Sequence, residues 1–228
     1  MGTYLITGIG RGIGRELARA LLMRGERVVG TVRDVERAAH EWGDFIASGR
    51  LKLLELDVRD EASVARAAHR LDEPVDVLVN NAGIISPERQ STLDMDFDGF
   101  LEALNVNTLG PLRVTQAFLP HLRRSAKPKI VTISSRMGSL SYAKSDRIAY
   151  RASKAAVNKV MQGLSTDLSE EGIVVISVHP GWVRTDMGGS GADISVQESA
   201  AGLLALIDRL TMEETGGFFD WQGQRIPF

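Results

Sequence analysis

Short apolar segments alternate with longer helical patterns along the whole chain of 228 residues, and this alternation limits the fold more than any other feature. The segments 75–79 and 130–133 consist mostly of aliphatic and β-branched residues, which is typical of strands buried on both faces. Strands of this kind that are separated by helices pair in parallel through right-handed crossovers. The sequence therefore predicts an α/β fold with a doubly wound, mostly parallel sheet and helices on both faces, in one domain over residues 1–228.

The alternation also gives approximate bounds for the elements. The expected strands cover residues 3–7, 27–32, 51–56, 75–80, 129–134 and 174–179, with a short seventh strand at 217–220. The expected helices cover residues 12–24, 60–70, 93–122, 149–169 and 196–209. Asp34 follows the second strand and is expected to cap one further helix.

Composition argues against several classes of protein. A net charge of −2 gives no electrostatic basis for binding nucleic acid or an anionic membrane. Cysteine is absent, which excludes disulfides and thiol catalysis and fits a reducing compartment, so we expect a cytoplasmic protein. The four histidines show no ligand spacing, so no metal is expected. We also expect no membrane span and no signal peptide, because no apolar run is long enough and a strand begins at once.

A glycine-rich loop, Thr7-Gly-Ile-Gly-Arg-Gly-Ile-Gly14, joins the first strand to the first helix. Glycines let the backbone approach a pyrophosphate closely, and the helix N-terminus supplies N–H donors and partial positive charge. The spacing differs from G-x-G-x-x-G, but the place between a strand and a helix favours a phosphate-binding loop over a flexible turn. The loop predicts a Rossmann-like fold with a dinucleotide bound at Gly8, Gly12, Ile13 and Gly14.

Tyr150 and Lys154 lie four residues apart at the start of a predicted helix, so they share one face of it. A lysine ammonium beside a phenol favours the phenolate and is expected to lower the tyrosine pKa from its usual value of about 10. Such a phenol can exchange a proton with a substrate oxygen near neutral pH. This spacing is common in helices, so it does not predict a catalytic role unless other motifs of the chain support one.

Several motifs occur in one order along the chain. They are Thr7-Gly-x-x-x-Gly-x-Gly14, Asn80-Asn-Ala-Gly83, Asn107, Ser134-Ser135, Tyr150-x-x-x-Lys154 and Pro180-Gly-Trp-Val-Arg-Thr185. Together they resemble the short-chain dehydrogenase/reductase family over essentially the whole chain. The small size, the tail 215–228 and the long segment before Tyr150 look like the C-factor and sniffer-like carbonyl reductases within it.

This resemblance implies a role for each polar residue of the catalytic group. Tyr150 would be the acid in carbonyl reduction and the base in the reverse direction, and Lys154 would lower its pKa and hold the nicotinamide ribose. Ser135 would stabilise the developing alkoxide, and Asn107 would hold a water that links Lys154 to solvent. Ser135 lies about two residues farther from Tyr150 than expected, which predicts a small insertion within 137–148. Ser139 and Ser141 are then alternative hydroxyls.

Two arginines favour NADP over NAD as the cofactor. Val32 occupies the position where an NAD enzyme often carries an acid, whereas Arg33 follows it and Arg11 lies in the glycine loop. Guanidinium groups suit the 2′-phosphate of NADP. The resemblance adds further cofactor contacts at Asp57, Val58, Asn81, Gly83, Pro180, Gly181, Val183 and Thr185. Asp57 could instead cap the next helix. For Asn80, a structural role is at least as well supported as a contact with the cofactor.

The leading prediction is an NADPH-dependent carbonyl reductase that acts on a small-molecule carbonyl or alcohol, with the short segment 186–196 leaving an open pocket. An alcohol dehydrogenase and a 3-oxoacyl thioester reductase are alternatives, the latter because of a basic cluster at Arg123, Arg124, Lys127 and Lys129. A third alternative is a non-catalytic dinucleotide-binding signalling protein. A homo-oligomer is expected from the helices within 101–122 and 149–168, which form dimer contacts in similar proteins.

Overall fold

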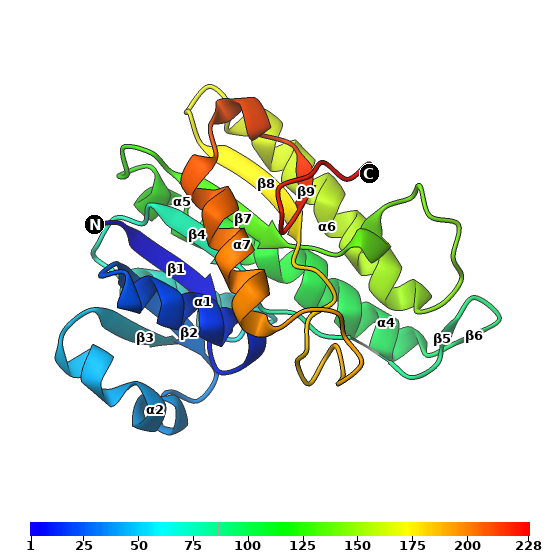
Figure 1. The fold of residues 1–228 in the computed structure, drawn as a ribbon, viewed down its shortest axis with the longest axis horizontal. Helices are drawn as coiled ribbons and strands as arrows, with labels where there is room; N and C mark the ends of the chain where they lie inside the picture. Colours follow the sequence, from blue (N-terminus) through cyan, green and yellow to red (C-terminus); the bar gives the residue numbers. More distant parts are fainter. Residues whose placement is uncertain (86) are drawn as a thin grey trace.

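The computed structural model describes residues 1–85 and 87–228. Seven parallel strands form one twisted sheet in the order β3-β2-β1-β4-β7-β8-β9 (Figure 1). The strands are β1 (Thr3–Thr7), β2 (Arg27–Val32), β3 (Leu51–Glu55), β4 (Val77–Asn80), β7 (Lys129–Ile133), β8 (Val174–His179) and β9 (Phe218–Asp220). This confirms the predicted doubly wound fold, since the chain builds outward from β1 in both directions.

Helices follow most strands and cover both faces of the sheet. They are α1 (Gly12–Met23), α2 (Val35–Ala47), α3 (Glu61–His69), α4 (Phe97–Leu104), α5 (Gly110–Leu122), α6 (Ile148–Asp167) and α7 (Val196–Arg209), with short 3-10 turns η2 (Arg136–Gly138) and η3 (Met212–Glu214). Asp34 caps α2, as predicted, by accepting a hydrogen bond from the Arg37 N–H at 2.9 Å. Within the described residues, no helix is long and apolar enough to cross a membrane.

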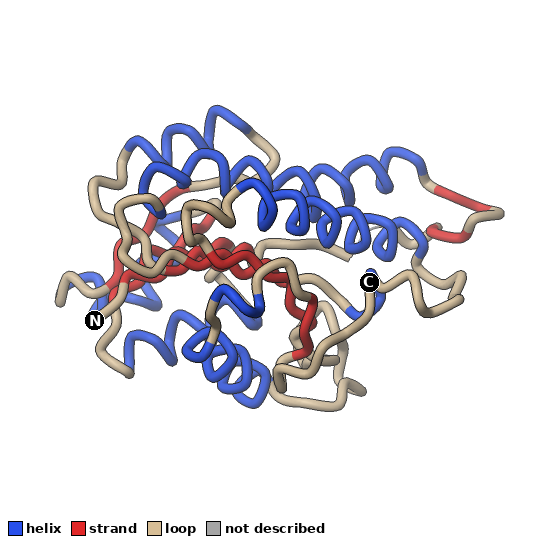
Figure 2. The backbone as a smooth tube through the Cα atoms, turned by 90° about the horizontal axis from the view of Figure 1, so that it is seen from above, coloured by secondary structure: helices blue, strands red, loops and turns tan. Residues whose placement is uncertain are grey.

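Two apolar cores lie on opposite faces of the sheet, because successive strand side chains point to opposite sides. Tyr4 and Ile6 of β1 pack with α1, α2 and α7 on one face. Leu5, between them, packs with α3, α5 and α6 on the other. Figure 2 shows the sheet edge-on between these two helical layers. Both faces are therefore buried, as the aliphatic strand sequences require.

The helical region expected over 93–122 begins four residues later, at Phe97, and then continues to Leu122 as α4, a π-helical turn and α5. Strands β5 (Gln90–Ser91) and β6 (Asp94–Met95) form a hairpin that extends beyond the helices at one end of the molecule (Figure 2). Helix α4 begins only after Asp96, whose carboxylate accepts the Gly99 N–H at 3.0 Å. A π-helical turn, η1 (Asn105–Leu109), then separates α4 from α5. Asn107 lies within this turn, and π-turns are frequent at functional sites.

Candidate active site

The predicted site residues gather at the carboxyl ends of β1, β4, β7 and β8. The chain reverses its direction of strand addition between β1 and β4, and ligands of open α/β sheets bind at such a switch point. The glycine loop follows β1, and Asn81 to Gly83 follow β4. Ser135 lies just beyond β7, and Pro180 follows β8. The parallel topology thus brings together motifs that are up to 170 residues apart in the sequence.

The glycine loop has the shape of a cradle that side chains would fill. Gly8 and Gly12 have positive φ angles of 75° and 58°, in the left-handed region where residues with a Cβ are strained. A Cβ on Gly14 would lie 2.5 Å from the Gly8 carbonyl oxygen and would also overlap the Asn81 amide. Arg11 precedes α1 in an extended conformation and, among the described residues, its side chain does not cap the helix. The first turn of α1 therefore fits a bound pyrophosphate.

Asn81 fixes this loop from the neighbouring strand. Its side-chain Nδ2 donates to the carbonyl oxygens of Thr7 at 2.8 Å and Gly8 at 3.2 Å. In return, Thr7 Oγ1 accepts the backbone N–H groups of Asn81 at 2.9 Å and Ala82 at 3.0 Å. Asn81 thus supports the loop through its amide, and Thr7 is a partner that the sequence reasoning did not single out. Asn80 is structural, since its Nδ2 donates to hydroxyls of two buried threonines.

Tyr150 and Ser135 meet at the start of α6. Tyr150 is only 8% exposed, and its phenol lies close enough to Ser135 for the serine hydroxyl to lower the phenol pKa. The Ser135 Oγ also accepts the Met137 N–H at 3.1 Å. A serine hydroxyl has one O–H donor besides its acceptor lone pairs, so the bond from Met137 leaves the Ser135 proton able to donate. The adjacent Ser134 donates to the Lys154 carbonyl oxygen at 3.4 Å, so of these two serines it is Ser135 that acts on the Tyr150 phenol.

Lys154 is buried beside Tyr150, with its Nζ 5.8 Å from the centroid of the Tyr150 ring. The Nζ donates to the Ile133 carbonyl oxygen at 2.8 Å. Burial lowers the pKa of Lys154 to about 8, because the charged ammonium loses water. At pH 7 Lys154 therefore stays mostly protonated, with two of its three N–H donors beyond the bond to Ile133.

The expected lowering of the Tyr150 pKa is wrong for this structure. Burial raises the pKa of the Tyr150 phenol, whereas the Ser135 hydrogen bond and the charge of Arg147 only partly lower it. The loss of hydration outweighs these two attractions because the ring lies almost wholly inside the protein. Lys154 contributes little here, since its Nζ is directed to the Ile133 carbonyl and its own charge is disfavoured by burial.

Asn107 completes the group from the π-helical turn. Its Oδ1 accepts the Ile84 N–H at 2.9 Å, and its Nδ2 donates to the Ile84 carbonyl at 2.9 Å and to Ser153 Oγ at 3.0 Å. A Cβ on Gly83 would lie 3.1 Å from Asn107 Oδ1 and 3.6 Å from Lys154 Nζ. Gly83 therefore lies directly between Asn107 and Lys154.

The segment between Ser135 and Tyr150 is fastened to α6 rather than left free. Arg151 donates to the Asp146 carbonyl at 2.8 Å, to the Asp146 carboxylate at 2.7 Å and to the Met137 carbonyl at 3.5 Å. Gly138 packs against the helix backbone, where an added Cβ would lie 2.6 Å from the Lys154 carbonyl carbon. Nothing in the sequence indicated these roles for Arg151 and Gly138. Of the two alternative hydroxyls, Ser139 accepts the Ser141 N–H at 3.3 Å and Ser141 is exposed.

The loop after β8 folds back toward the glycine loop. Gly181 has a positive φ of 89°, and a Cβ there would lie 2.5 Å from Ile194 Cδ1. Val183 is buried and bridges to Ile194, while Thr185 Oγ1 accepts the Gly188 N–H at 3.1 Å. A Cβ on Gly12 would lie 3.5 Å from Thr185 Cγ2, which places this loop beside the α1 N-terminus. Pro180 is held by Ser199, whose hydroxyl donates to its carbonyl at 2.6 Å.

The two predicted phosphate-binding arginines have different surroundings. Arg11 forms an exposed ion pair with Asp186 at 3.1 Å. Asp186 belongs to the loop after β8, so this loop binds the Arg11 guanidinium. Arg33 is exposed after β2, and its charge helps to lower the pKa of Asp57. Asp57 itself is bound by Arg59 through both carboxylate oxygens.

The structure also gives the surroundings of Asp57 and Val58, two residues predicted to contact the cofactor. Asp60, and not Asp57, caps α3 by accepting the Ala62 N–H at 3.0 Å, which removes the capping alternative for Asp57. Val58 is buried and close to Gly110, where an added Cβ would lie 3.0 Å from Val58 Cβ. Val58 therefore packs against the start of α5.

His179 lies at the end of β8. Its Nδ1 is buried without a hydrogen-bond partner among residues 1–85 and 87–228. Burial lowers its pKa to about 4, with a further lowering from the charge of Arg136. His179 is therefore neutral at neutral pH.

Gln90 of the β5–β6 hairpin contacts the backbone of Tyr150, and no sequence signal pointed to it. The side chain is 7% exposed, and its Oε1 accepts the Tyr150 backbone N–H at 3.1 Å. The residue fell inside a segment of unassigned sequence before the expected helix at 93. Its role depends on a contact across 60 residues, which local patterns cannot reveal.

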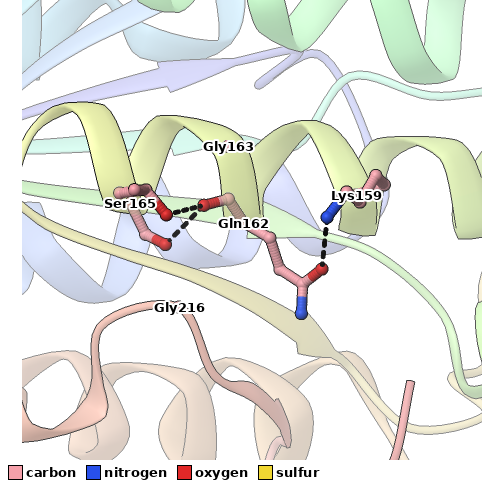
Figure 3. A pocket seen from close by; sticks show the side chains of 6 residues that line it. Lys159, Gln162, Gly163, Ser165 and Gly216 are labelled. Carbon is pink, nitrogen blue, oxygen red and sulfur yellow. Dashed lines mark hydrogen bonds between the residues drawn. The ribbon is translucent and has the colours of Figure 1, made fainter.

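Two surface hollows lie away from this site. One, of about 360 Å³, lies on the later turns of α6, where Lys159, Gln162 and Ser165 face Gly216 (Figure 3). Gln162 is about 18 Å along the helix from Tyr150. The other, of about 590 Å³, lies between α3 and α5 and includes His69 and His121. Neither hollow includes a predicted site residue.

Known proteins resemble this chain over most or all of its length. A family model described as short chain dehydrogenase matches residues 3–193. The C-signal of Myxococcus xanthus is 47% identical over 157 residues, which cover 68% of this chain and 93% of that protein. The NADPH-bound carbonyl reductase from chicken fatty liver has a TM-score of 0.92 at 33% identity, covering 100% of this chain and 99% of the other. The carbonyl reductase Sniffer of D. melanogaster has a TM-score of 0.92 at 31% identity and covers 100% of both.

These matches confirm the resemblance to C-factor and sniffer-like proteins that the motifs indicated. They agree with the parallel sheet, with the glycine loop at its switch point and with the grouping of Ser135, Tyr150 and Lys154. The chain therefore belongs to the short-chain dehydrogenase family of oxidoreductases.

Proposed function

We propose that the protein is an NADPH-dependent carbonyl reductase that converts an aldehyde or ketone to an alcohol. The observation that carries this proposal is the grouping of Tyr150, Ser135, Lys154 and Asn107 beside the glycine loop, at one edge of the sheet. A protein that only binds a dinucleotide has no need of a buried phenol joined to a hydroxyl. The likeness to an NADPH-bound carbonyl reductase adds support.

The residues present fit the nicotinamide dinucleotide that the family implies. Gly8, Gly12 and Gly14 would receive the pyrophosphate at the α1 N-terminus. Arg11 and Arg33 would bind the 2′-phosphate, and the buried, uncharged Val32 leaves the discriminating position free of a carboxylate. Asp57, Val58, Asn81 and Gly83 would form the adenosine side, and Pro180, Gly181, Val183 and Thr185 the nicotinamide side. When bound, NADPH supplies the hydride.

The protein's own residues would then manage the proton and the charge on oxygen. Tyr150 would donate its phenolic proton to the substrate oxygen, and Ser135 would donate a hydrogen bond to the same oxygen. The raised pKa of Tyr150 keeps the phenol protonated, which suits an acid in the direction of reduction. Lys154 would hold the ribose with its remaining N–H donors, and Asn107 would position the water that resupplies protons.

The test is an NADPH oxidation assay over a panel of aldehydes, ketones, quinones and diketones, with Tyr150→Phe as the matched variant. We expect the variant to lose about 100-fold to 10,000-fold in turnover because the proton donor is gone. Its NADPH affinity, measured by fluorescence titration, should stay within about threefold of wild type. Equal inertness of both proteins, with normal NADPH binding, would defeat the proposal.

A signalling protein is the second candidate, because the likeness to the Myxococcus xanthus C-signal favours it. The same assay separates the two: a signalling protein would bind NADPH without oxidising it in the presence of any carbonyl. The intact catalytic group favours turnover.

The two other enzyme alternatives have less support. The basic cluster that would dock an acyl carrier is engaged elsewhere: Arg123 pairs with Glu171 through two 2.7 Å bonds, and Lys129 donates to the Ile207 carbonyl at 2.6 Å. The cluster also lies at the amino end of β7, opposite the end that carries Ser135. Oxidation of an alcohol needs a phenolate as the base, which the raised Tyr150 pKa disfavours.

We also propose that the chain acts as one domain and assembles as a homo-oligomer. Phe97 and Leu101 lie one turn apart on α4 and are 74% and 65% exposed, which is typical of a face that another chain covers. Light scattering coupled to size-exclusion chromatography measures the assembly. The cytoplasmic location stays a prediction from the cysteine-free composition.

A further inference from the structure

The first turn of α6 carries Tyr150 but lacks a cap from its own sequence. The helix begins after Arg147, whose φ of 52° is left-handed and unique among the described non-glycine residues. Arg147 makes no side-chain capping bond within that described part of the chain. A cap residue normally accepts the N–H two or three positions later, and three positions after Arg147 is Tyr150.

Gln90 supplies the missing acceptor from a distant element. Its Oε1 accepts the Tyr150 N–H at 3.1 Å in a buried contact that spans 60 residues. A buried N–H without a partner is costly, so this bond holds the first turn in place. The acceptor meets the backbone of the very residue that carries the proposed proton donor.

The hairpin that carries Gln90 is itself anchored. Gln90 pairs with Met95 in the β5–β6 ladder, and the Asp96 N–H donates to the Arg89 carbonyl at 3.0 Å. Asp96 also caps α4, so the hairpin is continuous with a helix that packs on α6. The position of Gln90 is therefore set by the fold and not by a flexible loop.

We propose that Gln90 is a positioning residue, whose side-chain carbonyl fixes the backbone of Tyr150 and thereby the distance of the phenol from Ser135. This inference rests on the proposed reductase function. Gln90 contacts neither the phenol oxygen nor the reacting atoms, so it acts through Tyr150. Small displacements of a reacting group lower turnover steeply while leaving binding intact.

The test compares variants of Gln90 with a control on the same hairpin. Gln90→Met keeps the length but removes the acceptor, Gln90→Glu keeps an acceptor of equal reach, and Gln90→Asn keeps an amide that falls one methylene short. Asp94→Asn removes the exposed 2.9 Å ion pair between Asp94 and Arg89 and leaves Gln90 unchanged. NADPH titration shows whether each variant is folded.

Two measurements are made on each protein. The first is kcat and KM for the best carbonyl of the panel and for NADPH. The second is amide hydrogen exchange in protein labelled with ¹⁵N-tyrosine, which gives three signals because the chain has three tyrosines. Tyr150→Phe identifies the signal of residue 150, and Tyr4, buried in β1, serves as the internal reference.

We expect Gln90→Met and Gln90→Asn to lower kcat about 10-fold, with KM for NADPH within about twofold of wild type. The Tyr150 amide should exchange about 10-fold faster in both, while Tyr4 is unchanged. Gln90→Glu should restore both quantities to within about threefold, and Asp94→Asn should behave as wild type.

Wild-type kcat and wild-type Tyr150 exchange in a folded Gln90→Met or Gln90→Asn protein would overturn the proposal. So would equal losses in Asp94→Asn, since the effect would then belong to the whole hairpin. A wild-type protein that reduces no carbonyl would instead overturn the proposed function, and the Tyr150 exchange rates would still decide whether Gln90 holds this turn.

Discussion

The glycine-loop side of the site (residues 7–14 and 81–83) and the hairpin side (residues 90–95 and 136–151) are held by different kinds of contact. On the glycine-loop side, the Gly8 and Ile9 N–H groups donate to the Thr31 carbonyl at 3.0 and 3.1 Å, and Asn81 binds two loop carbonyls. On the hairpin side, the Gln90 side chain accepts the Tyr150 N–H. The Arg151 side chain there binds the Asp146 and Met137 carbonyls and the Asp146 carboxylate.

The two sides of the site place different requirements on their residues. The glycine-loop side requires particular backbone angles and the absence of side chains, which only glycine satisfies at Gly8, Gly12 and Gly14. The hairpin side requires particular side chains in register with a distant helix. We therefore expect changes on the first side to weaken cofactor binding, and changes on the second side to lower turnover.

The largest effect is expected from Gly14→Ala. The added Cβ would lie 2.5 Å from the Gly8 carbonyl oxygen and overlap the Asn81 amide, so the loop must move. We expect NADPH affinity to fall about 100-fold or more and the free energy of unfolding to drop by about 1–3 kcal/mol. Fluorescence titration and urea unfolding measure the two quantities.

Gly163→Ala is the matched control for that substitution. Gly163 is exposed on α6, and a Cβ there meets no atom within 4 Å. Alanine is the better helix former, so the control should stabilise the protein by about 0.4–1 kcal/mol and leave binding unchanged. NADPH binding by Gly14→Ala at wild-type strength would show that the loop tolerates a side chain, contrary to its geometry.

Gly138→Ala is expected to have the next largest effect, on the other side of the site. Its Cβ would lie 2.6 Å from the Lys154 carbonyl carbon, so the turn that carries Ser135 must shift away from α6. We expect kcat to fall about 10-fold to 100-fold. NADPH affinity should change little, which steady-state kinetics and titration together would show.

Gly14→Ala and Gly138→Ala together test whether the glycine-loop side controls cofactor binding while the hairpin side controls turnover. If Gly138→Ala weakened NADPH binding as much as Gly14→Ala, the two sides would not be independent. The same Gly163→Ala control applies, because all three changes add one methyl group to a glycine.

Arg33→Gln is expected to act more weakly, on the glycine-loop side alone. Loss of one charge-assisted contact to the 2′-phosphate should raise KM for NADPH about 10-fold and leave KM for NADH unchanged. Arg37→Gln, also exposed and one turn away on α2, is the control and should alter neither. Equal effects on NADPH and NADH would show that Arg33 does not read the 2′-phosphate.

The smallest effect is expected on the pH dependence of stability at His179, which ends β8. Its folded pKa of about 4 lies below the unfolded value of about 6.5, so the unfolded state gains the proton first as the pH falls. Stability from this residue is present above about pH 6.5 and is lost between about pH 6.5 and 4.

His179→Gln removes that contribution to the slope. Between pH 7 and pH 5, wild type should lose about 1–2 kcal/mol more of its unfolding free energy than the variant. Urea unfolding at the two pH values measures the difference. His40→Gln, at an exposed position on α2, is the control, and identical slopes in wild type and His179→Gln would contradict the burial argument.

Much of the fold followed from local sequence. Strands buried on both faces must be aliphatic, so their bounds were predictable to within about two residues. The loop at Gly8, Gly12 and Gly14 was predictable because only glycine meets its backbone demands, and the i, i+4 rule placed Tyr150 and Lys154 on one helix face.

The tertiary structure decided what depends on contacts between distant segments. It began the helical region expected over 93–122 only at Phe97, after the β5–β6 hairpin, and introduced a π-turn within that region. The hairpin and the π-turn place Gln90 and Asn107 against neighbours far along the chain. It reversed the expected direction of the Tyr150 pKa, since burial outweighs the attraction that a neighbouring lysine suggests in sequence. Local sequence sets backbone geometry and periodicity, whereas desolvation and long-range hydrogen bonds exist only once the chain has folded.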